Sequence, residues 1–551
     1  MAVGIGVLRR LVAIASYWIA TLVGTEGKHV LVLGGIMKSH HISFVPIVEE
    51  LCNRGHEVTF ALPNISEARE WFPKGVASAK LVYWGTDDWS VSGMKIPDMK
   101  QIPWWKQPLV WGDAIWNYRD MVDKPFFAML DDFRQFARTT TFDAALTSSI
   151  SMGLNQALKG MDVPFVNFLG LPAIPVMHMA YSEEMCRYPT MTTMMSVDDL
   201  RSSFAKRLKN QMTCQFLSVY EPISMHEINA VFAGHGFKPA NGWIEILQPA
   251  PVVVSLGGPP ISFPFKAPPS LHIVGTVERS KPRNIESVLL DWLEAPGGPV
   301  VCVSMGTKYE LTNETCKQFV SKAQEMVYDY GVRVLWSLRA SQQKALQHLL
   351  PKSYASLRIE EFTPQPEVLN HRAVMAFVSH CGWGGVTDAL AAGVPILAYP
   401  SFSDQNQNAA RLIDLGAALL VEPDFSNLIV ATHGVLGDPS FAQRAKDAGE
   451  ALQRYGGLKR LVDIFEVVAD GGQPVPDAAS TAAMADIDPF FLTPQTLEAS
   501  VAKAIWISIG LLLMGLLWLL GRCCCRCCCC CCPCCRSKSA AKGTSASKKK
   551  D

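Results

Sequence analysis

The sequence has no excess of charge of either sign. Its 551 residues include 50 basic and 50 acidic side chains, so the formal net charge is +0. A chain that binds a polyanion such as nucleic acid usually carries a basic surplus, and this chain has none. The composition therefore gives no support for a nucleic-acid partner.

Two motifs typical of other functions are also missing from the sequence. No Gly-x-Gly-x-x-Gly run follows the first strand-like segment, which argues against a nucleotide-dependent dehydrogenase. Residues 362–405, the most informative segment, contain no aspartate pair spaced to hold a cation. We therefore expect neither a dinucleotide cofactor nor a metal ion at this segment.

The length predicts more than one hydrophobic core. A chain of 551 residues suits two domains of roughly 200 residues each with additional segments. We predict an N-terminal domain at residues 28–275, a linker at 276–297 and a C-terminal domain at 298–470. A Pro-rich and weakly periodic stretch around residues 249–299 separates the two.

Both ends of the chain carry apolar segments typical of membrane proteins. Two arginines precede an apolar run, so residues 1–27 are interpreted as a secretory signal peptide, with an uncleaved anchor as the alternative. Residues 471–503 form a predicted tether to a second apolar segment. This uncharged segment, residues 504–521, has 18 residues and would cover about 27 Å as a helix, which just spans a thin bilayer.

The tail after this predicted span is basic and rich in cysteine. Residues 522–551 carry an excess of Lys and Arg, which predicts a cytosolic tail and a luminal body. Eleven of the 17 cysteines lie between Cys523 and Cys535. A reducing compartment excludes a disulfide framework there. These cysteines are candidates for S-acylation, with a low-complexity run or a metal cluster as the alternatives.

The body of the chain alternates strand-like and helix-like segments in two series. The first has strands at 29–33 and 57–62 around a helix with one apolar face, formed by Phe44, Ile47, Val48, Leu51 and Cys52. The second has strands at 300–304, 332–337, 374–379 and 396–399 and helices at 314–330 and 386–392. Such series build parallel sheets, so we predict two doubly wound α/β domains that face each other across a cleft.

One strand in the second series ends in a pattern that suits a diphosphate. The strand ends at His380, and three glycines follow where a helix begins: Gly382, Gly384 and Gly385. Glycines let the backbone come close to a ligand, and the N–H groups at a helix N-terminus attract anions. His380 can donate a hydrogen bond to a phosphate oxygen. Asp388 can accept hydrogen bonds from ribose hydroxyls, and Phe362 offers a flat face to a uracil.

The order and spacing of these residues resemble the donor-binding signature of UDP-glycosyltransferases, in a form similar to the plant secondary-product box. Pro364, Gln365 and the His-Cys-Gly-Trp step at 380–383 match the signature. Phe362 stands where Trp is usual, and Asp388 stands where Glu is usual. The resemblance also implies donor-binding roles for Thr307, Asp404 and Gln405.

The first half of the chain extends this resemblance. Ser39 and His40 precede the first helix, and an Arg-Gly-His-Glu-Val-Thr run at 54–59 follows at the family's distance. The resemblance places His40 at the position of the catalytic base, which would take the proton of an acceptor hydroxyl as it attacks the anomeric carbon. His41 is the alternative base under a one-residue alignment shift.

The second catalytic position departs from the family pattern. In the family an Asp orients and charges the histidine, and the resemblance places Ser148 at this position. A serine can hydrogen-bond the ring but cannot stabilise an imidazolium by charge. Asp143 lies five residues back, about 17 Å along an extended strand, which is too far to substitute. Reduced activity, another acid or a loss of catalysis all remain open.

The resemblance implies a GT-B-like fold with the UDP-sugar on the C-terminal domain and a small acceptor on the N-terminal one. It further implies inverting transfer of a hexosyl group, glucose or glucuronate, to a hydroxyl of a lipophilic compound, without a metal or cofactor. The alternative is a catalytically impaired UDP-sugar-binding membrane protein. Membrane-anchored relatives suggest the endoplasmic reticulum, and the lysines at 548–550 resemble a dilysine retrieval signal. A homo-oligomer is compatible with the sequence.

Overall fold

The structure is a computed structural model of the whole chain. It describes residues 27–34, 38–64, 66–69, 71–84, 133–148, 152–172, 197–242, 245, 250–262, 269–278, 282–306, 309, 311–352, 356–401, 404–475 and 493–531. Nearly all of the predicted signal peptide, the predicted donor residue Thr307 and the tail beyond Cys531 lie outside the described residues. The backbone of His40 is described as helical, but its side chain is not described.

A seven-stranded parallel sheet forms the N-terminal domain, with strand order β3-β2-β1-β4-β5-β6-β7. Its strands are β1 (His29–Leu33), β2 (Glu57–Pro63), β3 (Lys80–Trp84), β4 (Ala144–Ser148), β5 (Phe165–Pro172), β6 (Val252–Leu256) and β7 (Leu271–Ile273). Its helices are α2 (Lys38–Asn53), α3 (Ser66–Arg69), α5 (Met152–Lys159), α7 (Val197–Ser202) and α8 (Phe204–Gly234). Strand β1 lies between β2 and β4 inside the sheet, and its residues 30–33 are apolar and buried, as expected for a parallel sheet covered on both faces.

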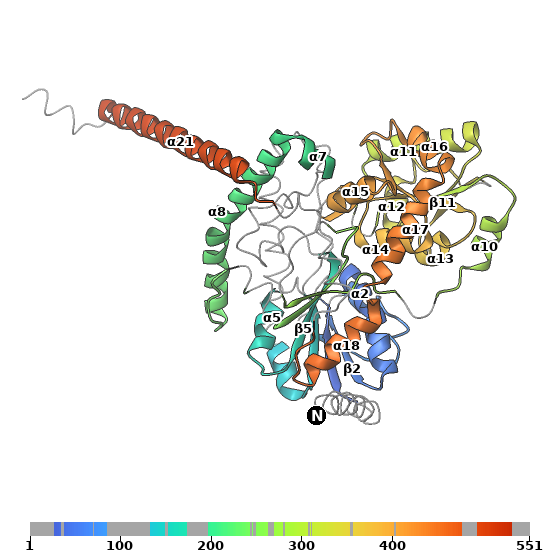
Figure 1. Ribbon diagram of the computed structural model, residues 1–551, viewed down its shortest axis with the longest axis horizontal. Coiled ribbons are helices and arrows are strands. Elements are labelled where there is room, and N and C mark those ends of the chain that lie inside the picture. The colour runs from blue at the N-terminus through green and yellow to red at the C-terminus, as the bar shows by residue number, and fades with distance from the viewer. Residues whose placement is uncertain are drawn as a thin grey trace, which may run out of the picture.

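A six-stranded parallel sheet forms the C-terminal domain, with strand order β10-β9-β8-β11-β12-β13. Its strands are β8 (Val300–Ser304), β9 (Arg333–Ser337), β10 (Leu357–Glu360), β11 (Val374–Ser379), β12 (Ile396–Ala398) and β13 (Ala418–Leu420). Its helices are α10 (Ser287–Glu294), α11 (Asn313–Tyr330), α12 (Ala340–Leu346), α13 (Gln365–Leu369), α14 (Trp383–Ala392), α15 (Asp404–Asp414), α16 (Leu428–Gly437) and α17 (Ser440–Gln453). Figure 1 shows the two sheet domains as separate lobes.

These two sheets confirm the predicted doubly wound α/β architecture. The predicted apolar face of α2 is buried: Phe44, Ile47, Val48 and Leu51 are at most 1% exposed. The helix stops where Gly55 adopts a φ of 89°, a left-handed conformation that glycine tolerates and other residues avoid.

The Pro-rich stretch between the two series contributes more regular structure than its sequence indicates. Strands β6 and β7 lie inside it and complete the N-terminal sheet, where β6 pairs with β5. Helix α10 lies within the segment predicted as the linker. Both strands are buried and short, with five residues in β6 and three in β7, so neither is long enough to show a period that a pattern could detect.

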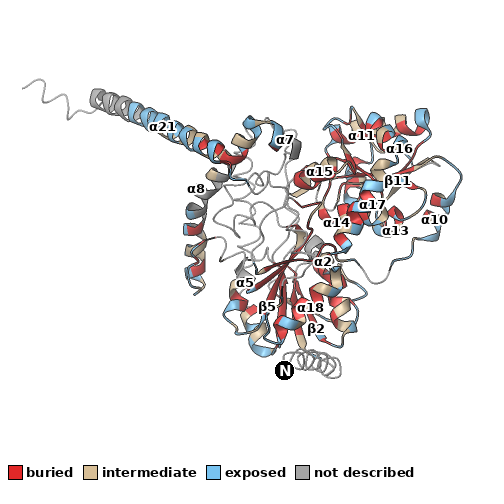
Figure 2. Ribbon diagram, viewed as in Figure 1, coloured by how far each residue is buried: buried red, intermediate tan, exposed pale blue. Residues whose placement is uncertain are grey.

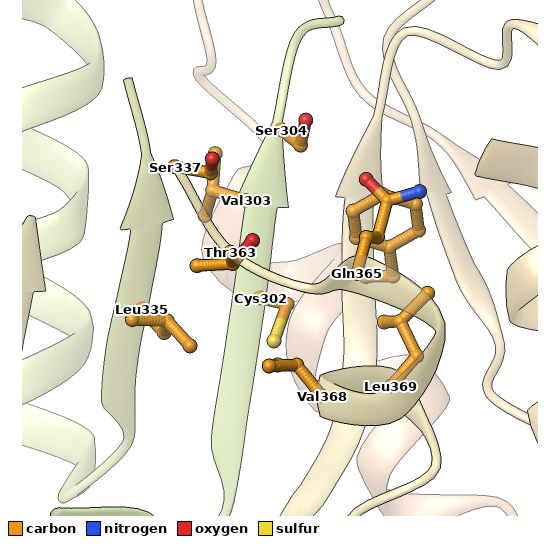
Figure 3. Close-up of a pocket in the computed structure, with 10 residues that line it drawn as sticks. Cys302, Val303, Ser304, Leu335, Ser337, Thr363, Gln365, Val368 and Leu369 are labelled. Carbon is orange, nitrogen blue, oxygen red and sulfur yellow. The ribbon is translucent and has the colours of Figure 1, made fainter. Parts of the chain in front are cut away.

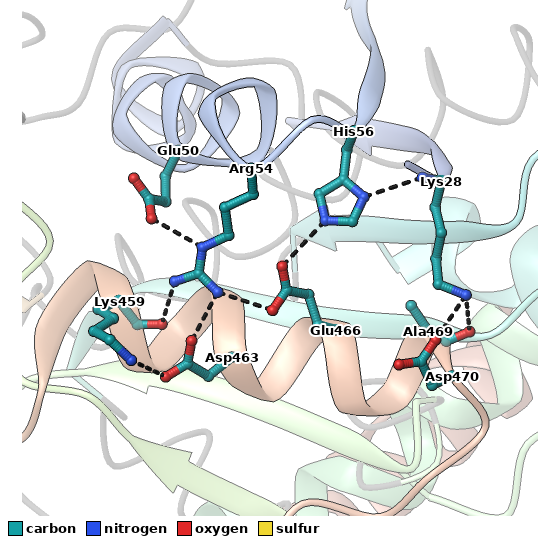
Figure 4. Close-up of polar contacts among 9 residues, drawn as sticks. All are labelled: Lys28, Glu50, Arg54, His56, Lys459, Asp463, Glu466, Ala469 and Asp470. Carbon is teal, nitrogen blue, oxygen red and sulfur yellow. Dashed lines mark hydrogen bonds and ion pairs between the residues drawn. The ribbon is translucent and has the colours of Figure 1, made fainter. Parts of the chain in front are cut away.

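Helix α18 (Gly457–Ala469) follows the C-terminal domain in the chain but packs against α2 and the N-terminal sheet. Figure 1 shows it crossing over the N-terminal lobe. A polar network fastens it there (Figure 4): Nη1 of Arg54 donates to Asp463 at 2.7 Å and to Glu466 at 2.8 Å. Nδ1 of His56 accepts a hydrogen bond from the backbone N–H of Lys28 at 3.2 Å. The other ring nitrogen of His56 lies 3.2 Å from Glu466.

One long helix leaves the body of the protein. Helix α21 (Thr496–Cys531) extends outward in Figure 1, and Figure 2 shows its described outer part as exposed. Residues 496–519 form a 24-residue stretch of mean hydropathy 1.9 that is long and apolar enough to cross a membrane. Exposed leucines on a helix of this length are typical of a membrane span, although length and composition are the only support for one.

Candidate functional site

The candidate site lies at the carboxyl edge of the C-terminal sheet. Strands β8 and β11 are neighbours, and their last residues, Ser304 and Ser379, are in register. The chain beyond each strand therefore emerges at the same edge, which is where open α/β sheets bind their ligands. His380 follows directly after β11, and Gly306 lies two residues beyond β8.

The imidazole of His380 is enclosed by two glycines from these two chain segments. A Cβ atom added to Gly306 would lie 2.5 Å from Nε2 of His380, and one added to Gly382 would lie 2.4 Å from it. Any side chain at either position would displace the ring, since real Cβ contacts do not approach so closely. The glycines at 306 and 382 thus fix the position of His380.

The turn from β11 into α14 has an unusual backbone. Cys381 adopts a φ of 62°, which is uncommon for a residue with a side chain and is found often at functional sites. Its N–H donates to Oγ of Ser379 at 3.0 Å, and its carbonyl accepts from the buried amide of Asn408 at 2.9 Å. Gly382 is the N-cap of α14, which begins at Trp383, so the first N–H groups of this helix lie close to His380 in the chain. Such groups have no partner within their own helix and attract anions.

Burial lowers the pKa of His380 to about 4, while a hydrogen bond with the backbone of Ser304 acts in the opposite direction. The ring is therefore neutral at physiological pH. A neutral imidazole carries one N–H donor and brings no charge of its own to the site. The anion preference of this edge then comes from backbone N–H groups and the helix dipole.

Gln365 and Asp388 meet across helices α13 and α14. Nε2 of Gln365 donates to Oδ2 of Asp388 at 2.8 Å. The amide thus holds the carboxylate that the sequence assigns to ribose hydroxyls.

In Figure 3, Gln365 and Thr363 lie with Ser304 and Ser337 around the upper end of a small recess, and apolar side chains form its floor. Polar groups around an apolar recess at a sheet edge suit a small polar ligand.

Phe362 precedes α13 and is 64% exposed. The guanidinium of Arg283 lies 5.8 Å from the centroid of this ring. Sequence reasoning did not identify Arg283, because it lies far from the signature in the segment interpreted as a linker. An exposed aromatic face at the rim is available for stacking on a flat base.

Asp404 and Gln405 open helix α15 after the neighbouring strand β12. Burial raises the pKa of Asp404 to about 6, although a hydrogen bond from Asn408 partly offsets this effect. Oε1 of Gln405 accepts from both the N–H and the hydroxyl of Ser401 at 3.0 Å. Asn408, which bridges Asp404 and the carbonyl of Cys381, was missed from the sequence. An asparagine four residues into a helix has no distinguishing local pattern.

The remaining predicted glycines differ in their surroundings. Gly384 is exposed, and nothing lies within 4 Å of the position that its Cβ would occupy. A Cβ on Gly385 would lie 3.4 Å from Oγ of Ser379 and 3.7 Å from Nε2 of Gln365. Position 384 therefore leaves space on the outer side of the helix, whereas position 385 faces the recess.

The N-terminal sheet contributes a second edge. Strands β1 and β4 are parallel neighbours, so their carboxyl ends lie at the same edge of the sheet. Gly34 follows β1 at this edge, and Ser148 is the last residue of β4. Ser148 is 4% exposed. Asp143 lies at the opposite end of β4, where its Oδ2 accepts from the backbone N–H of His29 at 2.7 Å. Asp143 therefore cannot reach the edge that holds Ser148.

His41 is fully buried in the N-terminal domain. Its ring lies 5.0 Å from the ring of Trp71 and 5.8 Å from that of Phe60, measured between centroids. A Cβ on Gly34 would lie 2.6 Å from its ring, so glycine at position 34 makes room for it. His41 thus packs within the domain.

Among the residues that the structure describes, no group of three or more His, Cys, Asp or Glu side chains is arranged to hold a metal ion. Groups at the sheet edge that can contact an anion include the backbone N–H groups at the start of α14. These are hydrogen-bond donors, which suit a phosphate oxygen directly.

Comparison with known proteins places this arrangement in a family. The chain is 22% identical over 425 residues to UDP-glucuronosyltransferase 2B7 of Homo sapiens, covering 74% of this chain and 77% of that protein. It is 32% identical over 197 residues to UDP-glycosyltransferase 71C2 of Arabidopsis thaliana, covering 33% of this chain and 40% of that protein. The chain thus spans less than half the length of this plant relative.

The chain shares its fold with the solved structure of glycosyltransferase VinC in complex with DTDP, with a TM-score of 0.55. The two sequences are 21% identical, and the match covers 81% of this chain and 100% of that chain. The sequence profile described as "UDP-glucoronosyl and UDP-glucosyl transferase" matches residues 28–445, which include both sheets and the candidate site. The chain therefore belongs to the UDP-glucuronosyl and UDP-glucosyl transferase family.

Proposed function

We propose that the protein transfers a hexosyl group, glucose or glucuronate, from a UDP-sugar to a hydroxyl of a small lipophilic acceptor, with inversion at the anomeric carbon. The observation that carries this proposal is the position of His380 between Gly306 and Gly382, beside the N-terminus of α14. Backbone N–H groups at the start of α14, which His380 adjoins, can bind a diphosphate and stabilise it as a leaving group.

The same edge offers partners for the rest of a UDP-sugar. Asp388, held by Gln365, would accept from the ribose hydroxyls, and Phe362 would stack on the uracil. Asp404 and Gln405 would hold the sugar hydroxyls from the start of α15. No metal or cofactor is needed in this proposal, because the helix N-terminus provides the donors for the leaving group.

His40 is the proposed general base. It lies in the first turn of α2, directly before His41, whose ring packs among aromatic side chains within the domain. An imidazole can take the proton of an acceptor hydroxyl as that oxygen attacks the anomeric carbon. Ser148 takes the place of the acidic partner, which motivates the alternative proposal of a catalytically impaired UDP-sugar-binding protein.

For its location, we propose the endoplasmic reticulum membrane, with a single span in α21, a luminal body and a cytosolic tail. The apolar stretch at residues 496–519 supports a span, and the basic tail beyond it supports the orientation.

Full-length protein in membranes, incubated with radiolabelled UDP-glucose or UDP-glucuronate and a panel of phenols and sterols, tests the proposal. We expect turnover with one donor and a loss of about 100-fold or more in His40→Ala, since general base catalysis contributes about that much. UDP binding should survive in this variant. The exposed His348 supplies a matched His→Ala control that should keep full activity. UDP-sugar binding without turnover, unchanged in His40→Ala, would favour the alternative.

A further inference from the structure

Helix α21 begins as part of the folded body. Nε of Arg207 in α8 donates to Glu498 at 2.8 Å, and the side chain of Glu498 is only 10% exposed. The carbonyl of Ala499 accepts from the side chain of Gln215 at 2.8 Å. Farther along, the indole N–H of Trp506 donates to the carbonyl of Met212 at 3.3 Å. The first residues of α21 therefore pack against α8.

This packing shortens the part of α21 that is available to a bilayer. The uncharged segment that follows Lys503 covers residues 504–521, which is 18 residues. At 1.5 Å per residue it spans about 27 Å, whereas the hydrocarbon core of a typical bilayer is about 30 Å thick. If Trp506 marks the membrane surface, the uncharged length that remains is about 22 Å. The part of the 24-residue apolar stretch that lies beyond the contacts with α8 is thus near the lower length limit for a membrane span.

The helix does not end with the uncharged segment. It continues without interruption to Cys531, so the first cysteines extend the same helical rod. Cys523 to Cys525 follow Gly521 by about 3 to 6 Å along the axis, and Cys529 to Cys531 follow it by about 12 to 15 Å. If residues 504–521 span the bilayer, the nearer three cysteines follow directly after the span on the same helix.

We propose that Cys523, Cys524 and Cys525 are S-acylated by long-chain fatty acyl groups, which complete a short membrane anchor. In this reaction the cysteine thiolate attacks the thioester carbonyl of a fatty acyl-CoA. A new sulfur–acyl bond forms, the bond between the acyl carbon and the CoA sulfur breaks, and CoA leaves as a thiol with the proton released by the cysteine. No oxidant or reductant is needed, and the acyl chains enter the lipid layer beside the helix.

Helix geometry disfavours a structural metal site formed by this run. Consecutive residues on a helix point about 100° apart, so the three adjacent cysteines cannot converge on one ion. Residues four apart share a face, but they offer one ion two ligands where structural zinc takes four. Acylation needs no such convergence, because each thiol reacts by itself.

The proposal rests on α21 crossing a membrane, and the experiment separates that requirement from the acylation itself. Full-length protein from eukaryotic cell membranes is first extracted with alkaline carbonate and must stay in the membrane fraction. Free thiols are then blocked, thioesters are cleaved with hydroxylamine, and the released thiols are counted by a maleimide mass tag. We expect hydroxylamine-dependent tags on the wild-type chain.

Two matched triple variants locate the modification. C523S/C524S/C525S should lose most of the tags, whereas C529S/C530S/C531S, with the same number of substitutions farther along the helix, should keep most of them. Catalytic turnover should be equal in both, because neither set lies in the sheet domains. Three results would each overturn the proposal: release by carbonate, thiols that become free on chelation without hydroxylamine, or equal tag loss in the two variants.

Discussion

Arg54 and Glu466 lie 412 positions apart in the sequence, yet Nη1 of Arg54 is 2.8 Å from Oε2 of Glu466. Burial acts to lower the pKa of Arg54, but hydrogen bonds to Glu50 and Asp463 outweigh this effect, and the net pKa is raised. The pair fastens α18 to the end of α2, the helix whose first turn carries His40. The contact thus ties α18, which follows the matched residues 28–445 in the chain, to the N-terminal domain.

We predict that Arg54→Met lowers the free energy of unfolding by about 2 kcal/mol, because it leaves Asp463 and Glu466 without their shared cation. A double-mutant cycle with Glu466→Gln should give a coupling energy of about 1 kcal/mol. Urea unfolding followed by Trp fluorescence measures both values. Lys459, whose side chain is 79% exposed in its pair with Asp463, is the control, and Lys459→Met should cost less than about 0.5 kcal/mol. Equal effects of the Arg54 and Lys459 variants would contradict a specific role for Arg54.

Substitutions at Gly382 and Gly384 should have opposite effects on stability. Gly382→Ala places a methyl group 2.4 Å from Nε2 of His380, so we expect a loss of about 1 to 3 kcal/mol and weaker UDP binding. Gly384→Ala meets nothing within 4 Å, and alanine in a helix should raise stability by about 0.5 to 1 kcal/mol. Chemical unfolding measures the stability of both variants, and a UDP titration measures the UDP affinity of Gly382→Ala. A stabilised Gly382→Ala would show that His380 is free to move.

Acid should weaken the protein through His380. Burial lowers the pKa of this residue from 6.5 to about 4, so the folded state binds fewer protons than the unfolded state between these values. Its contribution to stability is therefore complete above pH 6.5 and is lost as the pH falls toward 4, amounting to about 3 kcal/mol over that window. His380→Asn should flatten this part of the pH profile of unfolding.

His272 in β7 supplies a comparison from the other domain. Burial and the nearby charge of Arg460 lower the pKa of His272 to about 4 as well. The His272→Asn variant should therefore flatten the profile by a similar amount, and the two effects should add because the residues lie in different sheets. Parallel pH profiles for wild type and His380→Asn would rule out a buried neutral His380.

Ser148 offers a test of how far the missing carboxylate limits catalysis. Ser148→Asp should raise kcat by about tenfold or more, because a carboxylate can stabilise the imidazolium that forms on His40. Ser148→Asn has nearly the same shape without the charge and should leave kcat close to that of the wild type. Initial rates with a radiolabelled UDP-sugar measure both. An equal response of the two variants would mean that another group supplies the charge.

The sequence was sufficient for the repeating elements of the fold and for the main segment of the candidate site. The helix face of Phe44, Ile47, Val48 and Leu51 and the strand ending before His380 are local patterns, set by periodicity and by glycine spacing. The buried strands β6 and β7 were missed, because strands of five and three residues near prolines are too short to show a period.

Only the tertiary structure decided which distant residues meet. Asn408 reaches Cys381 because α15 returns beside α14, Arg54 finds Glu466 because α18 crosses to the other domain, and His41 packs beside Trp71 in the sheet domain. Each of these contacts depends on how whole elements pack, and side-chain packing between elements leaves no trace in the spacing of residues along one segment. The sequence alone could name the residues of a nucleotide-binding edge, but their partners follow from the geometry of two sheets and the helices that join them.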